Sequence, residues 1–88
     1  MATAQDVALW MVEELKNEEI LYQDVVVYQI VEKFGDEFTY YNNNGNLAIA
    51  KPVLDGFRKL TGDSVVWERG ARLWRQREGY DEPGRRQD

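Results

Sequence analysis

Residues 65–78, VVWERGARLWRQRE, constrain the fold of this chain more than any other segment. Gly70 and Ala71 can form a two-residue hairpin turn of type II′, in which glycine takes the first position with its positive φ. That turn places Trp67 directly opposite Trp74. A cross-strand aromatic pair stabilises a hairpin by roughly 0.2–1 kcal/mol relative to an alanine pair and fixes its register. The segment therefore predicts a two-stranded β-hairpin in the C-terminal part of the chain.

This register has one unfavourable pair and one competing interpretation. Besides the tryptophans, it pairs Val66 with Arg75, Glu68 with Leu73 and Arg69 with Arg72. The last pair brings two positive charges together, which only a well-hydrated hairpin tip tolerates. A helix over residues 71–78 is the competing interpretation, but its apolar side chains form a poor stripe. We therefore favour the hairpin.

The N-terminal part of the chain has the apolar spacing of a helix. Across residues 4–17, apolar side chains recur at steps of three and four residues, as they do on one face of a helix. Thr3 is placed to be the N-cap, and Asp6 in the first turn interacts favourably with the helix dipole. Residues 20–22 (ILY) follow as a short β-prone run, which predicts a small strand or an extended link.

Two more helices are predicted further along the chain. Residues 24–34 repeat the helical spacing, with Asp24 as the expected N-cap and Gly35 as the residue that ends the helix. Pro52 suits the first turn of a third helix, because its missing N–H has no partner there in any case. Gly62 is expected to end this third helix.

Two features leave alternatives open. Residues 36–50 contain the turn dipeptide Asn44-Gly45 and fit either a small hairpin or a structured loop. Gly56 inside the third helix costs roughly 1 kcal/mol relative to alanine, so it indicates either a break in the helix or a close approach of another helix. We expect the helix to be intact.

These elements predict the fold class. The order is helix, short strand, helix, hairpin or loop, helix and hairpin, which is the order of winged-helix domains. We therefore predict a single α+β domain over residues 1–78, winged-helix-like, with three helices and a C-terminal two-stranded β-hairpin. Residues 79–88, GYDEPGRRQD, predict a flexible C-terminal tail, because they combine Pro-Gly with mixed charges.

Two runs of the sequence resemble a known family. They are FTYYNNNGNLAI and FRKLTGDSVVWERGARLWRQRE, and the resemblance spans residues 4–78. The chain is similar to short uncharacterised bacterial proteins that carry a domain of unknown function with a winged-helix-like arrangement. The resemblance implies no catalytic or binding residue, and the wider likeness to winged-helix proteins implies nucleic-acid binding only by analogy of fold.

The composition argues against catalysis and cofactor binding. The 88 residues include no histidine and no cysteine, so the commonest general base, the thiolate nucleophile and the commonest zinc ligands are missing. The acidic pairs, such as Glu13-Glu14 and Asp36-Glu37, are adjacent in sequence, so their side chains diverge rather than converge on a substrate. We expect a protein that is not an enzyme and that uses no cofactor.

A calcium loop is also excluded. The run YNNNGN would place Gly45 at the sixth position of such a loop, with Tyr40 at the first and Lys51 at the twelfth. The acidic ligands that those two end positions require are missing, so we expect no metal. The asparagines are better interpreted as turn residues, because asparagine tolerates left-handed backbone.

Charge and hydropathy indicate the compartment and the kind of partner. The net charge of −5 combines residues 1–57, with three lysines and ten carboxylates, and residues 58–88, with eight basic and six acidic side chains. A dedicated nucleic-acid-binding domain is usually strongly basic. No apolar run approaches the roughly 18 residues of a membrane span, and the N-terminus lacks a signal-peptide pattern. We expect a cytoplasmic protein without a membrane partner.

Two sets of residues are candidates for the binding site. The candidate contacts with nucleic acid or another anionic partner are Lys51, Arg58, Lys59, Arg69 and Arg72. The candidate interface aromatics are Tyr22, Tyr28, Tyr40 and Tyr41. Aromatic side chains and arginine are enriched at protein interfaces, although they also serve as ordinary core and surface residues.

We therefore predict a small non-enzymatic binding module. It acts through protein–protein or self association, with a homodimer as one form. A nucleic-acid-binding winged-helix protein, similar to a transcription regulator, is the alternative, and the acidic net charge of −5 disfavours it.

Overall fold

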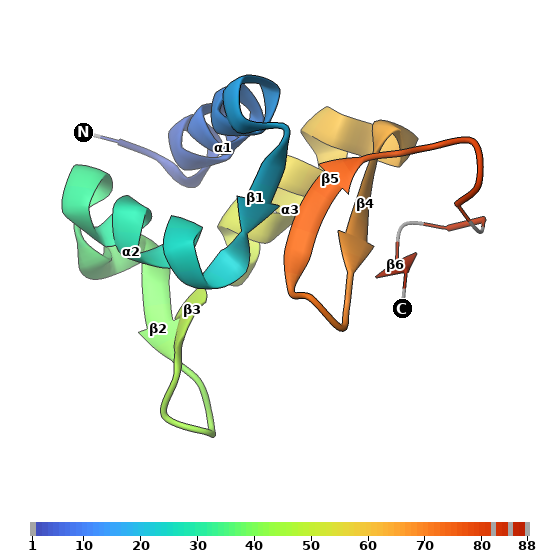
Figure 1. The fold of residues 1–88 in the computed structure, drawn as a ribbon. Helices are drawn as coiled ribbons and strands as arrows, with labels where there is room; N and C mark the ends of the chain where they lie inside the picture. The colour runs from blue at the N-terminus through green and yellow to red at the C-terminus, as the bar shows by residue number, and fades with distance from the viewer. Residues whose placement is uncertain (1, 82, 85, 88) are drawn as a thin grey trace.

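The computed structural model describes residues 2–81, 83, 84, 86 and 87, and these residues form an α+β fold of three α-helices and two small β-sheets (Figure 1). The helices are α1 (Ala4–Glu18), α2 (Gln23–Phe34) and α3 (Lys51–Thr61). The strands are β1 (Ile20–Tyr22), β2 (Thr39–Tyr41), β3 (Leu47–Ile49), β4 (Val65–Glu68), β5 (Leu73–Gln76) and β6 (Arg86–Gln87). Two 3-10 turns, η1 (Asp36–Phe38) and η2 (Gly62–Ser64), precede β2 and β4. The predicted α+β class and the three helices are confirmed.

Helix α1 begins as its sequence predicts. The Thr3 hydroxyl accepts a hydrogen bond from the Asp6 N–H (3.2 Å), and the Asp6 carboxylate accepts one from the Thr3 N–H (2.9 Å). This reciprocal pair satisfies two backbone donors that the first turn of a helix leaves without partners. At the other end, Glu19 takes a left-handed conformation (φ 71°) and donates its N–H to the Leu15 carbonyl (2.7 Å).

The prediction that Asp24 caps α2 is wrong. The N-cap residue is Tyr22, and its side chain makes no capping hydrogen bond. Strand β1 runs directly into α2, so the first helical N–H, that of Gln23, instead donates to the Arg72 carbonyl (3.0 Å) at the start of β5. Gly35 ends the helix with φ 90°, which confirms the predicted stop.

Gly56 allows α3 to lie directly against α1. A Cβ atom on Gly56 would stand 3.2 Å from the Cβ of Ala8 and 3.5 Å from the side-chain oxygen of Gln5. The helix is continuous through this residue, so the expectation of an intact helix is confirmed. Around the crossing, Met11 and Phe57 are fully buried and form the centre of the core.

The tryptophan pair sets the register of the larger sheet. Trp67 on β4 lies opposite Trp74 on β5, as predicted, and their ring centroids are 4.7 Å apart. Trp74 is buried and also meets the ring of Phe57 edge-on, at 5.5 Å between centroids, so the pair connects the sheet to α3.

The larger sheet corrects the prediction of a two-stranded C-terminal hairpin. In the described residues the strand order is β1-β5-β4-β6, with β1 antiparallel to β5 and β6 parallel to β4. The β4–β5 pair therefore has a neighbour on each side, although β6 pairs only with Trp67 and Glu68 in the described residues. The short β1 lies along the outer edge of β5. Leu21 pairs there with Trp74 and its apolar side chain is buried.

The turn between β4 and β5 also differs from the prediction. The strands end at Glu68 and Leu73, so the turn contains four residues rather than two. The left-handed conformation belongs to Arg72 (φ 55°), whereas Gly70 has no positive φ. The hydrogen bond from α2 to the Arg72 carbonyl explains the difference, because it fixes the end of this turn against the helix.

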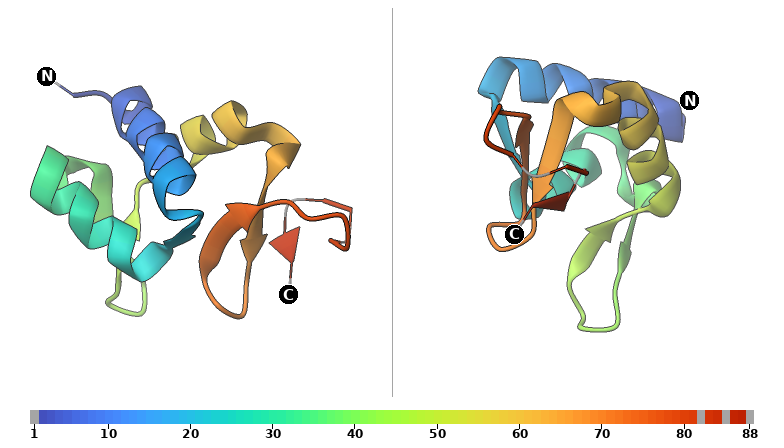
Figure 2. Two further views of the ribbon diagram at one scale, coloured as in Figure 1. Left: turned by 45° about the horizontal axis from the view of Figure 1, so that its top comes forward. Right: turned by 90° about the vertical axis from the view of Figure 1, so that its right-hand side faces the viewer.

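Residues 36–50 form a hairpin, which resolves the ambiguity left by the sequence. Strands β2 and β3 pair antiparallel, with Tyr41 opposite Leu47. The side chain of Asn42 accepts hydrogen bonds from the N–H groups of Asn44 and Asn46 (both 3.0 Å), and Gly45 has φ 79°. The β2–β3 hairpin and the β4–β5 turn both extend away from α1, on either side of the start of α2 (Figures 1 and 2).

Two further observations concern the chain as a whole. Among the residues that the structure describes, no helix is both long and apolar enough to cross a membrane. The segment predicted as a tail returns toward the larger sheet, where β6 pairs with β4. It also places Asp81 against Arg75.

Candidate interaction surface

The arginines of the β4–β5 segment are mostly engaged within the chain. Arg72 forms an ion pair with Asp24 of α2 (3.3 Å). Arg77 donates from Nε to the Asp63 carbonyl (2.6 Å) and from its guanidinium to the Gly84 carbonyl. These pairings link neighbouring segments of the fold, so neither side chain presents its full set of donors to an external anion.

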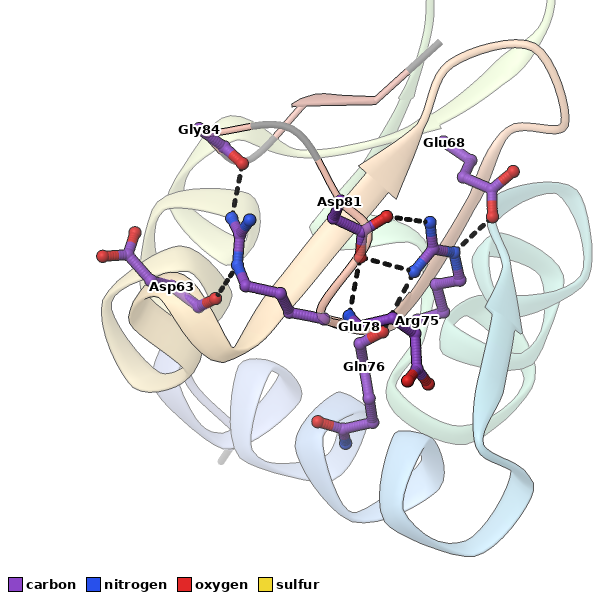
Figure 3. A network of polar contacts seen from close by, with 8 residues as sticks. Asp63, Glu68, Arg75, Gln76, Glu78, Asp81 and Gly84 are labelled. Carbon is purple, nitrogen blue, oxygen red and sulfur yellow. Dashed lines mark hydrogen bonds and ion pairs between the residues drawn. The ribbon is translucent and has the colours of Figure 1, made fainter.

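Arg75 is the centre of a polar network beside the sheet (Figure 3). Its guanidinium makes two hydrogen bonds to the Asp81 carboxylate (2.9 and 2.7 Å) and one to Glu68. The Arg75 hydrogen bonds lower the pKa of Asp81 from 3.8 to about 2, with a second contribution from the N–H of Glu78. The same carboxylates raise the pKa of Arg75 above its ordinary value. The network is structural, because both partners are largely shielded from solvent.

The predicted nucleic-acid contacts do not form one basic surface. Lys51 is paired with Asp55 (2.9 Å) one helical turn away. Arg58 and Lys59 are exposed and line one depression, but Asp55 and Asp63 line it too. Arg72 lines a different depression, which it shares with residues of α2 and of the β2–β3 hairpin. Arg69 is exposed at the β4–β5 turn.

Three of the four predicted interface tyrosines lie together. Tyr28 of α2 and Tyr41 of β2 line a depression of about 330 Å³, and Tyr40 joins them around an adjoining depression of about 370 Å³. Leu47 of β3 borders both. Tyr28 is 63% exposed and Tyr41 is 73% exposed, so this aromatic cluster faces solvent.

The fourth tyrosine lines a separate depression at the start of α2. Tyr22 lines a further depression of about 450 Å³ together with Ile20 and Val25, and all three side chains are exposed. Val25 precedes Tyr28 by three residues, so the two are neighbours on the helix surface. We call the whole set the α2–hairpin surface. Its members are Ile20, Tyr22, Val25, Tyr28, Tyr40, Tyr41 and Leu47.

Charged side chains border this surface. Asp24 and Arg72 stand together at the depression that Tyr28 and Tyr41 line. Asp36 borders the adjoining one, and Glu14 and Glu18 border the depression next to Tyr22; these positions add further carboxylates. The rim is therefore mainly acidic, with one arginine that is already paired.

Sequence reasoning missed the aliphatic members and the polar pair. In the run Val25–Val26–Val27, only the last two are buried, and the first is exposed beside the tyrosines. The helical spacing of Val25 and Tyr28 was a usable signal, since it places them together on the face opposite the core. The ion pair of Asp24 with Arg72 had no such signal, because it depends on how β5 meets α2.

The groups that the α2–hairpin surface exposes are those that contact other proteins. Within the described part of the chain, no three carboxylates converge in a way that could hold a metal ion. The exposed groups of the α2–hairpin surface are aromatic rings, aliphatic side chains and phenolic hydroxyls. Such groups supply buried area and hydrogen bonds to another protein.

Comparison with known proteins gives one match. A family model described as "Family of unknown function (DUF6953)" matches residues 3–76, which include every element from α1 to β5. Neither the curated proteins nor the solved structures gave a match. The predicted resemblance to an uncharacterised family is confirmed, and the matched region ends where the C-terminal segment begins.

Proposed function

The chain belongs to this family of unknown function, and we propose that it is a small non-enzymatic binding module that acts through the α2–hairpin surface. The observation that carries the proposal is the solvent exposure of Tyr28 and Tyr41 around a shared depression. Because both side chains line the same depression, one partner can contact both rings. Contiguous exposed apolar groups with a polar rim are typical of protein-binding surfaces.

The charge of the rim supports a protein partner other than a second copy. The carboxylates of Asp24, Asp36 and Glu18 border the surface, so two copies that met through it would bring like charges together. Like charges placed opposite each other across an interface disfavour association. The complementary partner presents aliphatic side chains to the tyrosines and lysine or arginine to the rim. Self association through this surface is the other outcome of the test.

We infer that the arrangement is winged-helix-like, with the β2–β3 hairpin inserted between the second and third helices. The support is the antiparallel pairing of β1 with β5 beside the β4–β5 hairpin, after three helices in the expected order. This likeness keeps nucleic acid as the alternative partner. The pairing of Arg72 and Lys51 with carboxylates counts against it. The sequence-based expectations of a bacterial origin and a cytoplasmic location remain part of the proposal.

A selection experiment with random peptides tests the proposal without knowledge of the natural partner. The full chain is immobilised and used to select binders from a displayed library of random peptides. We expect the selected peptides to share an aliphatic anchor with nearby lysine or arginine, because these groups match the tyrosines and the acidic rim. Their binding should be lost in the double variant Tyr28→Ser/Tyr41→Ser and retained in Leu9→Ser, a matched exposed site on α1.

Three results would contradict the proposal. One is a set of selected peptides that binds the double tyrosine variant as tightly as the original chain. Another is a concentration-dependent dimer in light scattering that the double tyrosine variant abolishes, which would assign the surface to self association. The third is micromolar binding of a mixed-sequence DNA duplex that weakens steeply with salt, which would favour the nucleic-acid alternative.

A further inference from the structure

Strand β4 has an outer edge that the family-matched region leaves open. Within residues 3–76, β4 pairs only with β5, so its other edge presents unpaired backbone groups. Beside that edge lies a groove of about 620 Å³ between α3 and the sheet, and the apolar side chains that line it are Leu54, Phe57, Trp67 and Trp74. An open edge next to an apolar groove is the arrangement to which an extended peptide adds as a further strand.

The C-terminal segment of the same chain occupies this edge. Strand β6 runs parallel to β4, with Arg86 opposite Trp67, and Arg86 also lines the groove. In the described residues, β6 pairs with only two of the four residues of β4. A strand that paired with all four residues of β4 would therefore make a longer ladder than the described part of β6 makes.

Asp81 attaches the base of this segment to the sheet. Asp81 closes a turn by accepting a hydrogen bond from the Glu78 N–H (2.7 Å) while it binds Arg75, and this turn directs the chain back toward β4 (Figure 3). The side chain of Asp81 is only 3% exposed. Arg77 adds a second attachment through the Gly84 carbonyl.

We propose that the outer edge of β4 and the adjoining groove form a second binding site, for an extended arginine-containing peptide strand of a partner protein, and that the C-terminal segment occupies this site in cis. The cis strand shows the chemistry that fits, because it adds to β4 in parallel and places an arginine beside Trp67. A partner strand long enough to pair with all four residues of β4 replaces it. This site is separate from the α2–hairpin surface.

A labelled peptide in trans tests whether the site exchanges strands. The probe is a fluorescein-labelled synthetic peptide with the sequence of residues 79–88, GYDEPGRRQD, and fluorescence anisotropy measures its binding to the full chain. In the original chain the cis strand competes with the probe. Asp81→Asn weakens the bond to Arg75 but keeps an oxygen that accepts from the Glu78 N–H, so it releases the segment with little change elsewhere.

We expect Asp81→Asn to bind the probe about tenfold more tightly than the original chain, because occupancy of the site in cis lowers the apparent affinity by the fraction that is closed. Arg86→Pro provides an independent opening, since proline cannot donate to the strand ladder and leaves Asp81 in place. Glu37→Gln, at an exposed carboxylate on η1, is the matched control and should behave like the original chain.

Three results overturn the inference. One is equal affinity of the probe for the original chain, Asp81→Asn and Arg86→Pro when all three have the same circular dichroism spectrum. Another is equal binding of a scrambled peptide. The third is loss of probe binding when Tyr28→Ser/Tyr41→Ser is added to Arg86→Pro, because the probe would then sit on the α2–hairpin surface. In that case the proposed function stands and the β4 site does not.

Discussion

The close approach of α1 and α3 at Gly56 predicts that a small side chain is tolerated at this position and a large one is not. Alanine adds a Cβ that lies 3.2 Å from the Cβ of Ala8. This is about 0.3 Å inside the 3.5 Å lower end of comfortable carbon–carbon contacts. Alanine also favours a helix over glycine by about 1 kcal/mol. The two effects nearly cancel, so Gly56→Ala should change the free energy of unfolding by less than about 1 kcal/mol.

Leucine at the same position should be clearly destabilising. Its three additional carbons extend from a Cβ that already stands 3.2 Å from the fully buried Ala8, so the two helices must move apart to accept them. Overpacking of a core costs about 1–3 kcal/mol, so we expect Gly56→Leu to lower the free energy of unfolding by about 2 kcal/mol. Lys59→Leu adds the same side chain at an exposed position of α3 and should change it by less than about 0.5 kcal/mol.

Urea unfolding followed by tryptophan fluorescence measures these changes. Adding Ala8→Gly to Gly56→Ala removes the Cβ that the new alanine would contact. The double-mutant cycle of these variants then measures the interaction free energy between the two positions. Gly56→Leu that is as stable as the original chain would refute the close approach. Additive effects in the Ala8 and Gly56 double variant would refute it as well.

Two further predictions concern the start of α1 and the attachment of the C-terminal segment. Thr3→Ala removes the side-chain cap and should lower the free energy of unfolding by about 1 kcal/mol, measured by urea unfolding, while loss of less than a few tenths would contradict the capping geometry. The pKa of Asp81 is lowered to about 2 in the folded chain, so its contribution to stability is complete above pH 3.8 and disappears as the pH falls through about 2. Amide exchange at Glu78, whose N–H donates to Asp81, should therefore stay slow at pH 4 and become faster near pH 2, and Asp81→Asn should remove this dependence beyond the intrinsic pH effect on exchange.

Local patterns in the sequence were sufficient for the helices and for the tryptophan register. The N-cap at Thr3, the stop at Gly35 and the pairing of Trp67 with Trp74 all involve residues that are close in sequence. Their geometry is set within one turn of helix or one hairpin. Each can therefore be predicted without knowledge of the rest of the fold.

Local sequence patterns could not predict the contacts between segments that are distant in the chain. The Arg72 carbonyl accepts a hydrogen bond from the Gln23 N–H at the start of α2, 49 residues earlier in the chain. This contact explains why the predicted N-cap and the predicted turn type were wrong. The pairing of β1 with β5 likewise joins distant segments. Arg75 and Asp81 lie in a stretch of mixed charges, so the sequence does not show which acidic residue pairs with Arg75. The pair forms because the chain reverses direction after β5.

The candidate surface was likewise predictable in its residue types but not in its long-range arrangement. The exposed tyrosines were identified by residue type, but their gathering around one depression depends on where the β2–β3 hairpin meets α2. From the sequence, Arg69 and Arg72 are candidate contacts with an anionic partner. The folded chain uses Arg72 and Arg75 to hold its own segments together, and this shifts the expected binding surface from the arginines to Tyr28 and Tyr41.

The most direct test of the binding proposal is the affinity of the tightest selected peptide for the original chain and for Tyr28→Ser/Tyr41→Ser, measured by calorimetry. Removal of aromatic anchors from an interface costs more than about 1 kcal/mol each, so the account predicts a loss of affinity of about thirtyfold or more. Leu9→Ser should leave the affinity unchanged, and both variants should keep the stability of the original chain, because all three positions are exposed. Equal affinity for the original chain and the tyrosine variant would contradict the account.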